Sequence, residues 1–173
     1  MLPAFEPDPG MALLGLFDTA LPQVYGYLLP RCGNRSLAED LAAESFLAAV
    51  VAVRKPEAAV PNIAWLIGVA RHKLVDHWRR QEREERFLQL AHDSEPETDD
   101  PWDEQLDALR ARDVLATLGA HHRAALTLRY ADGLPVPDVA ELLGRTVHAT
   151  EALLVRARRA FRSRYEEGEG GRR

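Results

Sequence analysis

Several features that define common protein classes are scarce or missing in this chain. Cys32 is its single cysteine, so no internal disulfide can form and a disulfide-stabilised secreted scaffold is excluded. No apolar run approaches the roughly 20 residues that a membrane-spanning helix needs. Residues 1–10 hold acids and prolines without the basic start of a signal peptide. We therefore expect a cytoplasmic protein that does not insert into a membrane.

Signatures of catalysis are missing as well. The sequence has no glycine-rich phosphate loop, no nucleophile elbow and no carboxylate–histidine motif. His72, Asp76 and His77 lie about one helical turn apart, but a zinc site needs three or four ligands and no other lies nearby. The adjacent His121 and His122 offer even less. We predict no metal, no cofactor and no catalysis, and metal analysis would test the alternative of an enzyme built on His72, Asp76 and His77.

The alternation typical of strands is also missing, whereas apolar residues recur at spacings of three and four. The sequence therefore predicts an all-α protein. The first stretch is a helix, or a helix pair kinked at Pro22, whose apolar side consists of Leu14, Phe17, Leu21, Val24 and Leu28. Further helices are expected at residues 36–53, 63–86, 106–118 and 121–131.

Two of these helices have recognisable starts. Ser36 and Glu39 have the spacing of a capping box, and Asn62 can cap the helix that follows the loop 54–61. The expected buried side of that later helix consists of Ile63, Ile67, Ala70, Leu74 and Trp78. Its other residues mix basic side chains with Trp65, which suits single-stranded nucleic acid, although Trp65 and Trp78 also fit a core. For Trp78 the core is the preferred interpretation.

An acidic segment divides the chain. Residues 87–109 hold eight acids and neither lysine nor arginine, and two prolines interrupt them. This composition predicts a flexible linker between two small helical domains, acting either as a solvated tether or as a nucleic-acid mimic. The expected divisions are an arm at 1–10, domains at 11–86 and 105–166, a linker at 87–104 and a tail at 167–173.

The C-terminal domain contains the pattern of a helix-turn-helix. A short helix with Val139, Leu142 and Leu143 on its apolar side ends at Gly144, and Thr146 can cap a longer second helix. Residues 145–164 hold six arginines and one acid, in a chain whose net charge is −5. An ordinary helical hairpin with a solvated charged face is the alternative. The face expected to meet DNA consists of His148, Glu151, Ala152, Val155, Arg156, Arg159 and Arg162.

Both halves together resemble a bacterial RNA polymerase sigma factor of the extracytoplasmic-function (ECF) type. Residues 38–41 and 44–47 resemble the core-polymerase docking helix of the second conserved region, and 64–71 and 76–80 its promoter-melting helix. The similarity to the fourth region lies in residues 126–130, 133–134, 139–144 and 156–158. The order of these segments, with the acidic linker between them, carries the resemblance.

The resemblance implies a transcription initiation factor whose partners are core RNA polymerase and promoter DNA, both as duplex and as melted single strand. An anti-sigma factor is a further candidate partner, and the expected location is the nucleoid in the cytoplasm. The resemblance assigns docking on core polymerase to Glu39, Asp40 and Glu44, although an acidic cluster is also typical of solvated surface. The resemblance assigns contact with the minus-ten element to Asn62, Trp65, Arg71, His72, Asp76, Arg79 and Arg80. It assigns contact with the minus-thirty-five element to the C-terminal face listed above. Asn62 fits a base contact and a helix cap equally well.

Three positions depart from the family pattern: Ala43, where glutamine is frequent, and Glu151 and Leu153, where basic residues are frequent. An acid facing a phosphate-lined groove is unfavourable unless it accepts a hydrogen bond from cytosine N4. We therefore do not carry over the family's usual minus-thirty-five sequence preference to this chain. The rival interpretation is a helix-turn-helix repressor or activator that acts without core polymerase, which tight operator binding by the protein alone would favour.

Overall fold

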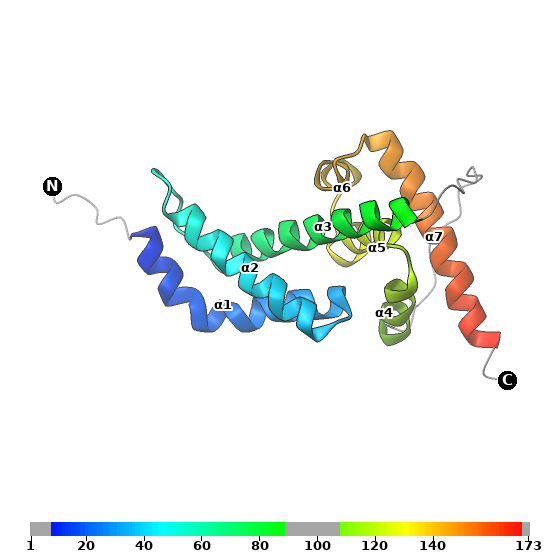
Figure 1. The fold of residues 1–173 in the computed structure, drawn as a ribbon, viewed down its shortest axis with the longest axis horizontal. Coiled ribbons are helices and arrows are strands. Elements are labelled where there is room, and N and C mark those ends of the chain that lie inside the picture. The colour runs from blue at the N-terminus through cyan, green and yellow to red at the C-terminus, as the bar shows by residue number, and fades with distance from the viewer. Residues whose placement is uncertain (1–7, 89–107, 171–173) are drawn as a thin grey trace. The chain divides into compact units, whose positions relative to one another are not determined.

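A computed structural model describes residues 8–88 and 108–170, and every regular element within these ranges is a helix (Figure 1). The N-terminal helices are α1 (Pro9–Cys32), α2 (Arg35–Val53) and α3 (Ile63–Leu88). The C-terminal ones are α4 (Ala108–Thr117), α5 (Ala120–Leu126), the π-helical turn η1 (Thr127–Ala131), α6 (Val136–Leu143) and α7 (Val147–Gly170). The all-α prediction is confirmed. Most of the predicted linker lies outside the described residues.

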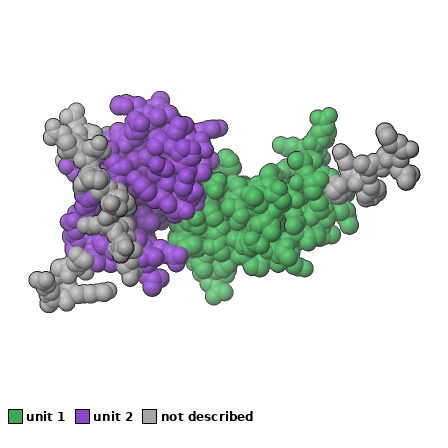
Figure 2. Space-filling model, turned by 180° about the vertical axis from the view of Figure 1, so that it is seen from behind, with its two compact units in different colours: residues 1–74 green, residues 75–173 purple. Residues whose placement is uncertain are grey.

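The chain forms two compact units, residues 1–74 and 75–173, which meet inside α3 (Figure 2). The last turns of α3 therefore belong to the same unit as α4 to α7. The family-like domain boundaries expected from the sequence stay a prediction, because compactness alone does not define them.

In the first unit, α1 and α2 pack against each other as a helical hairpin (Figure 1). α1 begins at Pro9 behind an Asp8 cap, and it runs as one helix through Pro22. The predicted apolar side is right from Val24 onward and wrong before it. Leu13 is buried there, whereas Leu14 is 69% exposed. Phe17, which is 42% exposed, packs by its edge against Phe46 of α2, with ring centroids 5.0 Å apart.

The predicted capping box at the start of α2 is wrong, because the N-cap is Asn34 and the helix begins two residues earlier than a box on Ser36 requires. Gly33 ends α1 in the left-handed conformation, with φ at 64°, and leaves Asn34 extended. The Asn34 side chain then accepts a hydrogen bond from the amide of Leu37 at 3.2 Å, which is the role of an N-cap. Glu39 instead pairs with Arg35 on the surface, with 3.0 Å between Oε1 and Nε.

α3 begins where the sequence predicted, since Oδ1 of Asn62 accepts from the amide of Trp65 at 2.9 Å. Its buried side is shifted by one position from the expected one in its first turns. Leu66 is fully buried, whereas Ile63 and Ile67 are half-buried. From Ala70 onward the prediction is confirmed, and the buried side continues through Leu74, Val75 and Trp78. The preferred assignment of Trp78 to the core is confirmed.

In the second unit, α5 passes into the π-helical turn η1 before the chain reverses. Within η1 the amide of Asp132 donates to the carbonyl of Thr127 at 3.0 Å. Gly133 follows with φ at 68°, which allows the amide of Leu134 to reach the carbonyl of Leu128 at 3.1 Å. The predicted helix 121–131 is thus α5 plus η1, and the reversal aims the chain into α6.

The helix-turn-helix prediction is confirmed in its geometry. α6 is preceded by Pro135 and followed by Gly144, whose φ of 64° and amide bonds to the α6 carbonyls form a left-handed C-terminal cap. Thr146 then accepts a hydrogen bond from the amide of Ala149 at 3.1 Å and opens α7. The buried side chains of α6 and α7 are Val139, Ala140, Leu143, Thr150, Leu153, Leu154, Ala157 and Phe161.

Candidate nucleic-acid interface

The predicted DNA face of α7 lies opposite the helix's buried side. His148, Glu151 and Arg159 are exposed, whereas Arg156 and Arg162 are half-buried. Ala152 and Val155 are half-buried between them. The small side chains at these two positions let the helix approach a groove closely, while the flanking arginines provide positive charge. The face therefore has the shape and charge that a major-groove helix needs.

Leu153 is only 1% exposed, so it points into the core and away from this face. The sequence marked it as a departure from a frequently basic position. Its burial explains why an apolar residue is tolerated there, because the side chain gains apolar contact rather than facing water. Glu151 remains on the exposed side as the single acid of the basic segment.

The histidine pair at the start of α5 packs beneath α7. The rings of His121 and His122 lie 4.1 Å apart. Burial lowers the pKa of His122 to about 4, with further lowering by the nearby charges of His121, Arg156 and Arg164. Burial also lowers the pKa of His121. Both rings are half-buried and neutral at pH 7, so neither adds positive charge to the predicted DNA face.

The neutral His122 predicts a pH-dependent stability. Above pH 6.5 the His122 ring is neutral in both the folded and the unfolded chain. Between pH 6.5 and about 4 the ring binds a proton in the unfolded chain and stays neutral in the folded chain. The free energy of unfolding should thus fall as the pH drops through this window. Thermal unfolding from pH 7 to 4 measures this decrease in the free energy of unfolding. The decrease should be smaller for His122→Gln than for the unchanged protein, and it should be the same as in the unchanged protein for His148→Gln, at an exposed position of the same unit. Equal pH profiles for both variants would contradict the assignment.

α3 presents a second polar strip. Trp65 is 37% exposed, and His72, Asp76, Arg79 and Arg80 are exposed further along the helix. The first four recur at spacings of seven, four and three, which keeps them on one side of an α-helix, with Arg80 at the edge of that side. Arg71 lies about a third of a turn away and is half-buried. Asn62 is exposed in front of the strip with its carbonyl oxygen engaged as the helix cap, so its amide nitrogen is the group left for a base.

The predicted docking residues lie on the outer side of α2. Asp40 is exposed, and Glu44 is half-buried with 3.9 Å between its Oε2 and Nζ of Lys73. Leu47 and Val51 continue the same side one and two turns later, and they are 67% and 62% exposed. Sequence reasoning missed both. Asp40, Glu44, Leu47 and Val51 therefore form one acidic and apolar strip on the outer side of α2.

Within the described residues no three histidine, cysteine, aspartate or glutamate side chains gather where they could hold a metal ion. His72 and Asp76 lie on the exposed side of α3. None of the described helices is long and apolar enough to cross a membrane.

The helix-turn-helix and its basic second helix place the chain among DNA-binding proteins of the transcription machinery. Comparison with known protein families identifies the family. Residues 16–84 match the family model of sigma-70 region 2, and residues 108–161 match that of sigma-70 region 4. The chain belongs to the sigma-70 family of RNA polymerase sigma factors, within its ECF group. Sigma factors as a class are non-catalytic subunits of RNA polymerase.

Two relatives illustrate the likeness. The chain is 32% identical to the ECF RNA polymerase sigma factor SigL of Mycobacterium tuberculosis over 88% of each chain. It is 30% identical to the ECF RNA polymerase sigma factor BldN of Streptomyces coelicolor over 84% of this chain, which spans 57% of that relative's length. Among solved structures, the sigma factor RpoE in complex with the anti-sigma factor NepR from Bartonella quintana shares the fold, with a TM-score of 0.54 at 21% identity over 88% of this chain and 95% of that one.

Proposed function

We propose that this chain is a transcription initiation factor that binds core RNA polymerase and directs it to promoters with a minus-ten and a minus-thirty-five element. The observation that supports this most is the presence of two separate candidate DNA surfaces, the strip on α3 and the outer face of α7, on one chain with an acidic and apolar strip on α2. An ordinary repressor needs the α7 face alone.

The α3 strip has the composition for melted DNA. Trp65 offers a ring on which an unpaired base can stack, and Arg79 and Arg80 offer charge for the backbone. Extruding a base from the duplex costs a few kcal/mol, which stacking on an aromatic ring and hydrogen bonds to the base edge offset. The Nδ2 group of Asn62 lies next to Trp65, where a base edge would come, because its Oδ1 accepts from the Trp65 amide.

The α7 face would read the minus-thirty-five duplex. The N-terminal turns of a recognition helix meet base edges, and later turns run along phosphates. On this chain the early turns carry His148, Glu151 and Ala152, the middle carries Arg156, and the later turns carry Arg159 and Arg162. Glu151 fits a cytosine N4 donor, which would give this protein a preference of its own.

Substitution of Arg156 should separate base reading from backbone contact. We expect Arg156→Ala to cost about 1–3 kcal/mol on the preferred duplex and to relax the choice of base at one position. Arg162→Ala, about two turns later, should weaken all duplexes alike and lower the salt slope by about one unit. Both effects are measured by titrating matched and singly substituted duplexes at several salt concentrations. Uniform weakening by Arg156→Ala would instead make Arg156 a phosphate contact.

A footprint tests the proposal as a whole. Core polymerase with this protein should protect both elements of a target promoter, with thymines near minus ten becoming reactive to permanganate as they lose their partners. Core polymerase alone should do neither. Strong, specific protection by the protein alone, unchanged by polymerase, would favour the repressor or activator interpretation.

An anti-sigma factor is proposed as a regulatory partner. The solved sigma factor RpoE, which shares the fold, was crystallised with one. In this chain the exposed apolar side chains of α2, Leu47 and Val51, are the surface we expect such a partner to cover. Competition between that partner and core polymerase for this protein, together with weaker binding of the partner by a Leu47→Asp variant, would support the assignment.

A further inference from the structure

A glycine lies within the strip of α3 that is proposed to meet melted DNA. Gly68 follows Trp65 by three residues and precedes His72 by four, so these three residues share one side of the helix. The step from Trp65 to His72 is about 10 Å along the helix axis, at about 1.5 Å per residue. A strand that stacks on Trp65 and runs along the helix toward His72 therefore passes over Gly68.

No contact with the described part of the chain requires a glycine at this position. The φ of Gly68 is not positive, unlike those of Gly33, Gly133 and Gly144, where the chain turns. A Cβ built on Gly68 would have no heavy atom within 4 Å outside its own stretch of helix, so neither Trp65 nor His72 reaches that space. An alanine side chain would therefore fit without displacing any of its neighbours.

Glycine also makes this helix less stable than alanine would. It loses more backbone freedom on folding than any other residue, so it is unfavourable in a helix interior. Gly15 and Gly26 of α1 are helical glycines with open space around them as well, but both lie outside the proposed DNA strip. Gly68 differs from them by its place beside the exposed ring of Trp65, where a missing side chain has a use in binding a ligand.

We infer that Gly68 is a contact residue for melted DNA, an inference that rests on the proposed function. Its bare backbone forms a notch between Trp65 and His72, in which the sugar or base of a single strand approaches the helix closely. A methyl group would project about 1.5 Å further out. Because a gap of about 0.5–1 Å removes roughly a quarter to a half of a dispersion contact, this methyl group would lift the strand off the Trp65 ring.

The first measurement compares the stability of two variants. Gly68→Ala and Gly26→Ala should each raise the melting temperature by roughly 2–4 °C, because each removes a glycine from a helix interior. Gly26→Ala is the matched control, since Gly26 also has open space around it and lies on α1. A higher melting temperature also shows that each variant is folded, so any loss of DNA binding has another cause.

The second measurement is binding of single-stranded DNA by the complex with core polymerase. The probe is a fluorescently labelled oligonucleotide with the non-template sequence of the minus-ten element of a promoter that the protein transcribes. Gly68→Ala should bind it about fivefold or more weakly than the unchanged protein, as expected from loss of stacking for one base. Gly68→Leu should bind it more weakly still, and Gly26→Ala should bind it as the unchanged protein does. Equal binding by Gly68→Ala and Gly26→Ala would overturn the inference.

A double variant tests whether the notch acts through the tryptophan ring. Trp65→Ala together with Gly68→Ala should bind the oligonucleotide no more weakly than Trp65→Ala alone, because the notch lets the strand reach that ring. Fully additive losses would show that the two positions act independently and would contradict the role given to the notch.

Two further outcomes would also overturn the inference, and they differ from each other. If Gly68→Ala lowers the affinity for core polymerase while oligonucleotide binding at saturating core is unchanged, the open side of Gly68 faces protein. If the unchanged protein adds no single-strand binding to that of core alone, the proposed function fails together with the inference. Normal binding by the unchanged protein with no effect of Gly68→Ala refutes the notch alone.

Discussion

Charge reversal of Asp40 and Glu44 to lysine is expected to abolish co-purification of this protein with core RNA polymerase. The two carboxylates lie one turn apart on the outer side of α2, followed by the exposed Leu47 and Val51. A basic partner surface that pairs with them would face two like charges after the change. Disrupting a buried charge pair at an interface costs about 2–5 kcal/mol, so a loss of at least about thirtyfold in affinity is expected.

The matched control reverses two other exposed acids of the same unit, Asp18 and Glu57, which changes the net charge by the same amount. That control should bind core normally, and both proteins should keep their helical circular dichroism. Leu47→Asp should also weaken binding, since it places a charge in the apolar part of the strip. Undiminished core binding by the Asp40 and Glu44 variant would move the docking surface elsewhere.

Loss of the Trp65 ring should block promoter opening more than promoter binding. Stacking of a base on an aromatic ring contributes about 1–3 kcal/mol, so Trp65→Ala should lower the open-complex population about ten- to a hundredfold. Trp65→Phe keeps a ring and should restore most of it. Opening is followed by permanganate reactivity or by fluorescence of 2-aminopurine placed at minus ten.

Phe87 provides the control for this experiment, because it is 88% exposed on the same helix and outside the proposed strip. Phe87→Ala should open promoters as the unchanged protein does. If Trp65→Ala also opens them normally while remaining folded, the ring is part of the fold and does not trap bases.

Local signals in the sequence predicted much of this architecture. Gly144 and Thr146 define the turn of the helix-turn-helix through backbone conformation and capping, which depend on residues only a few positions away. Asn62 capped its helix for the same reason. The placement of α7's exposed side also followed from periodicity, because a long helix with one strongly apolar side has few ways to pack.

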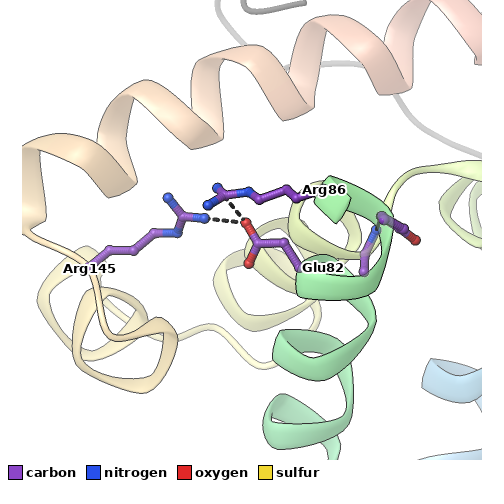
Figure 3. Close-up of polar contacts among 5 residues, drawn as sticks. Glu82, Arg86 and Arg145 are labelled. Atoms are coloured by element: carbon purple, nitrogen blue, oxygen red, sulfur yellow. Dashed lines mark hydrogen bonds and ion pairs between the residues drawn. The ribbon is translucent and has the colours of Figure 1, made fainter. Parts of the chain in front are cut away.

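What the sequence could not predict depends on contacts between distant segments. Leu13 faces inward and Leu14 outward, but the spacing within α1 fits either choice, so the choice cannot be made from that helix alone. Leu153 looked like a departure on a DNA face until its packing beside Trp78 was seen. Glu82 pairs with Arg145 (Figure 3), but the two are 63 residues apart, so no local pattern could pair them. Leu47 and Val51 were missed because periodicity does not reveal which apolar residues stay uncovered.

Run-off transcription tests the central claim most directly. Core polymerase purified without any sigma factor is mixed with this protein and a set of genomic promoter fragments, and transcripts are measured by length. The account predicts transcripts of defined start that need both the protein and core, that disappear with the Asp40 and Glu44 reversal, and that fall sharply with Trp65→Ala. Absence of any protein-dependent transcript across the set, with core shown active by another sigma factor, would contradict it.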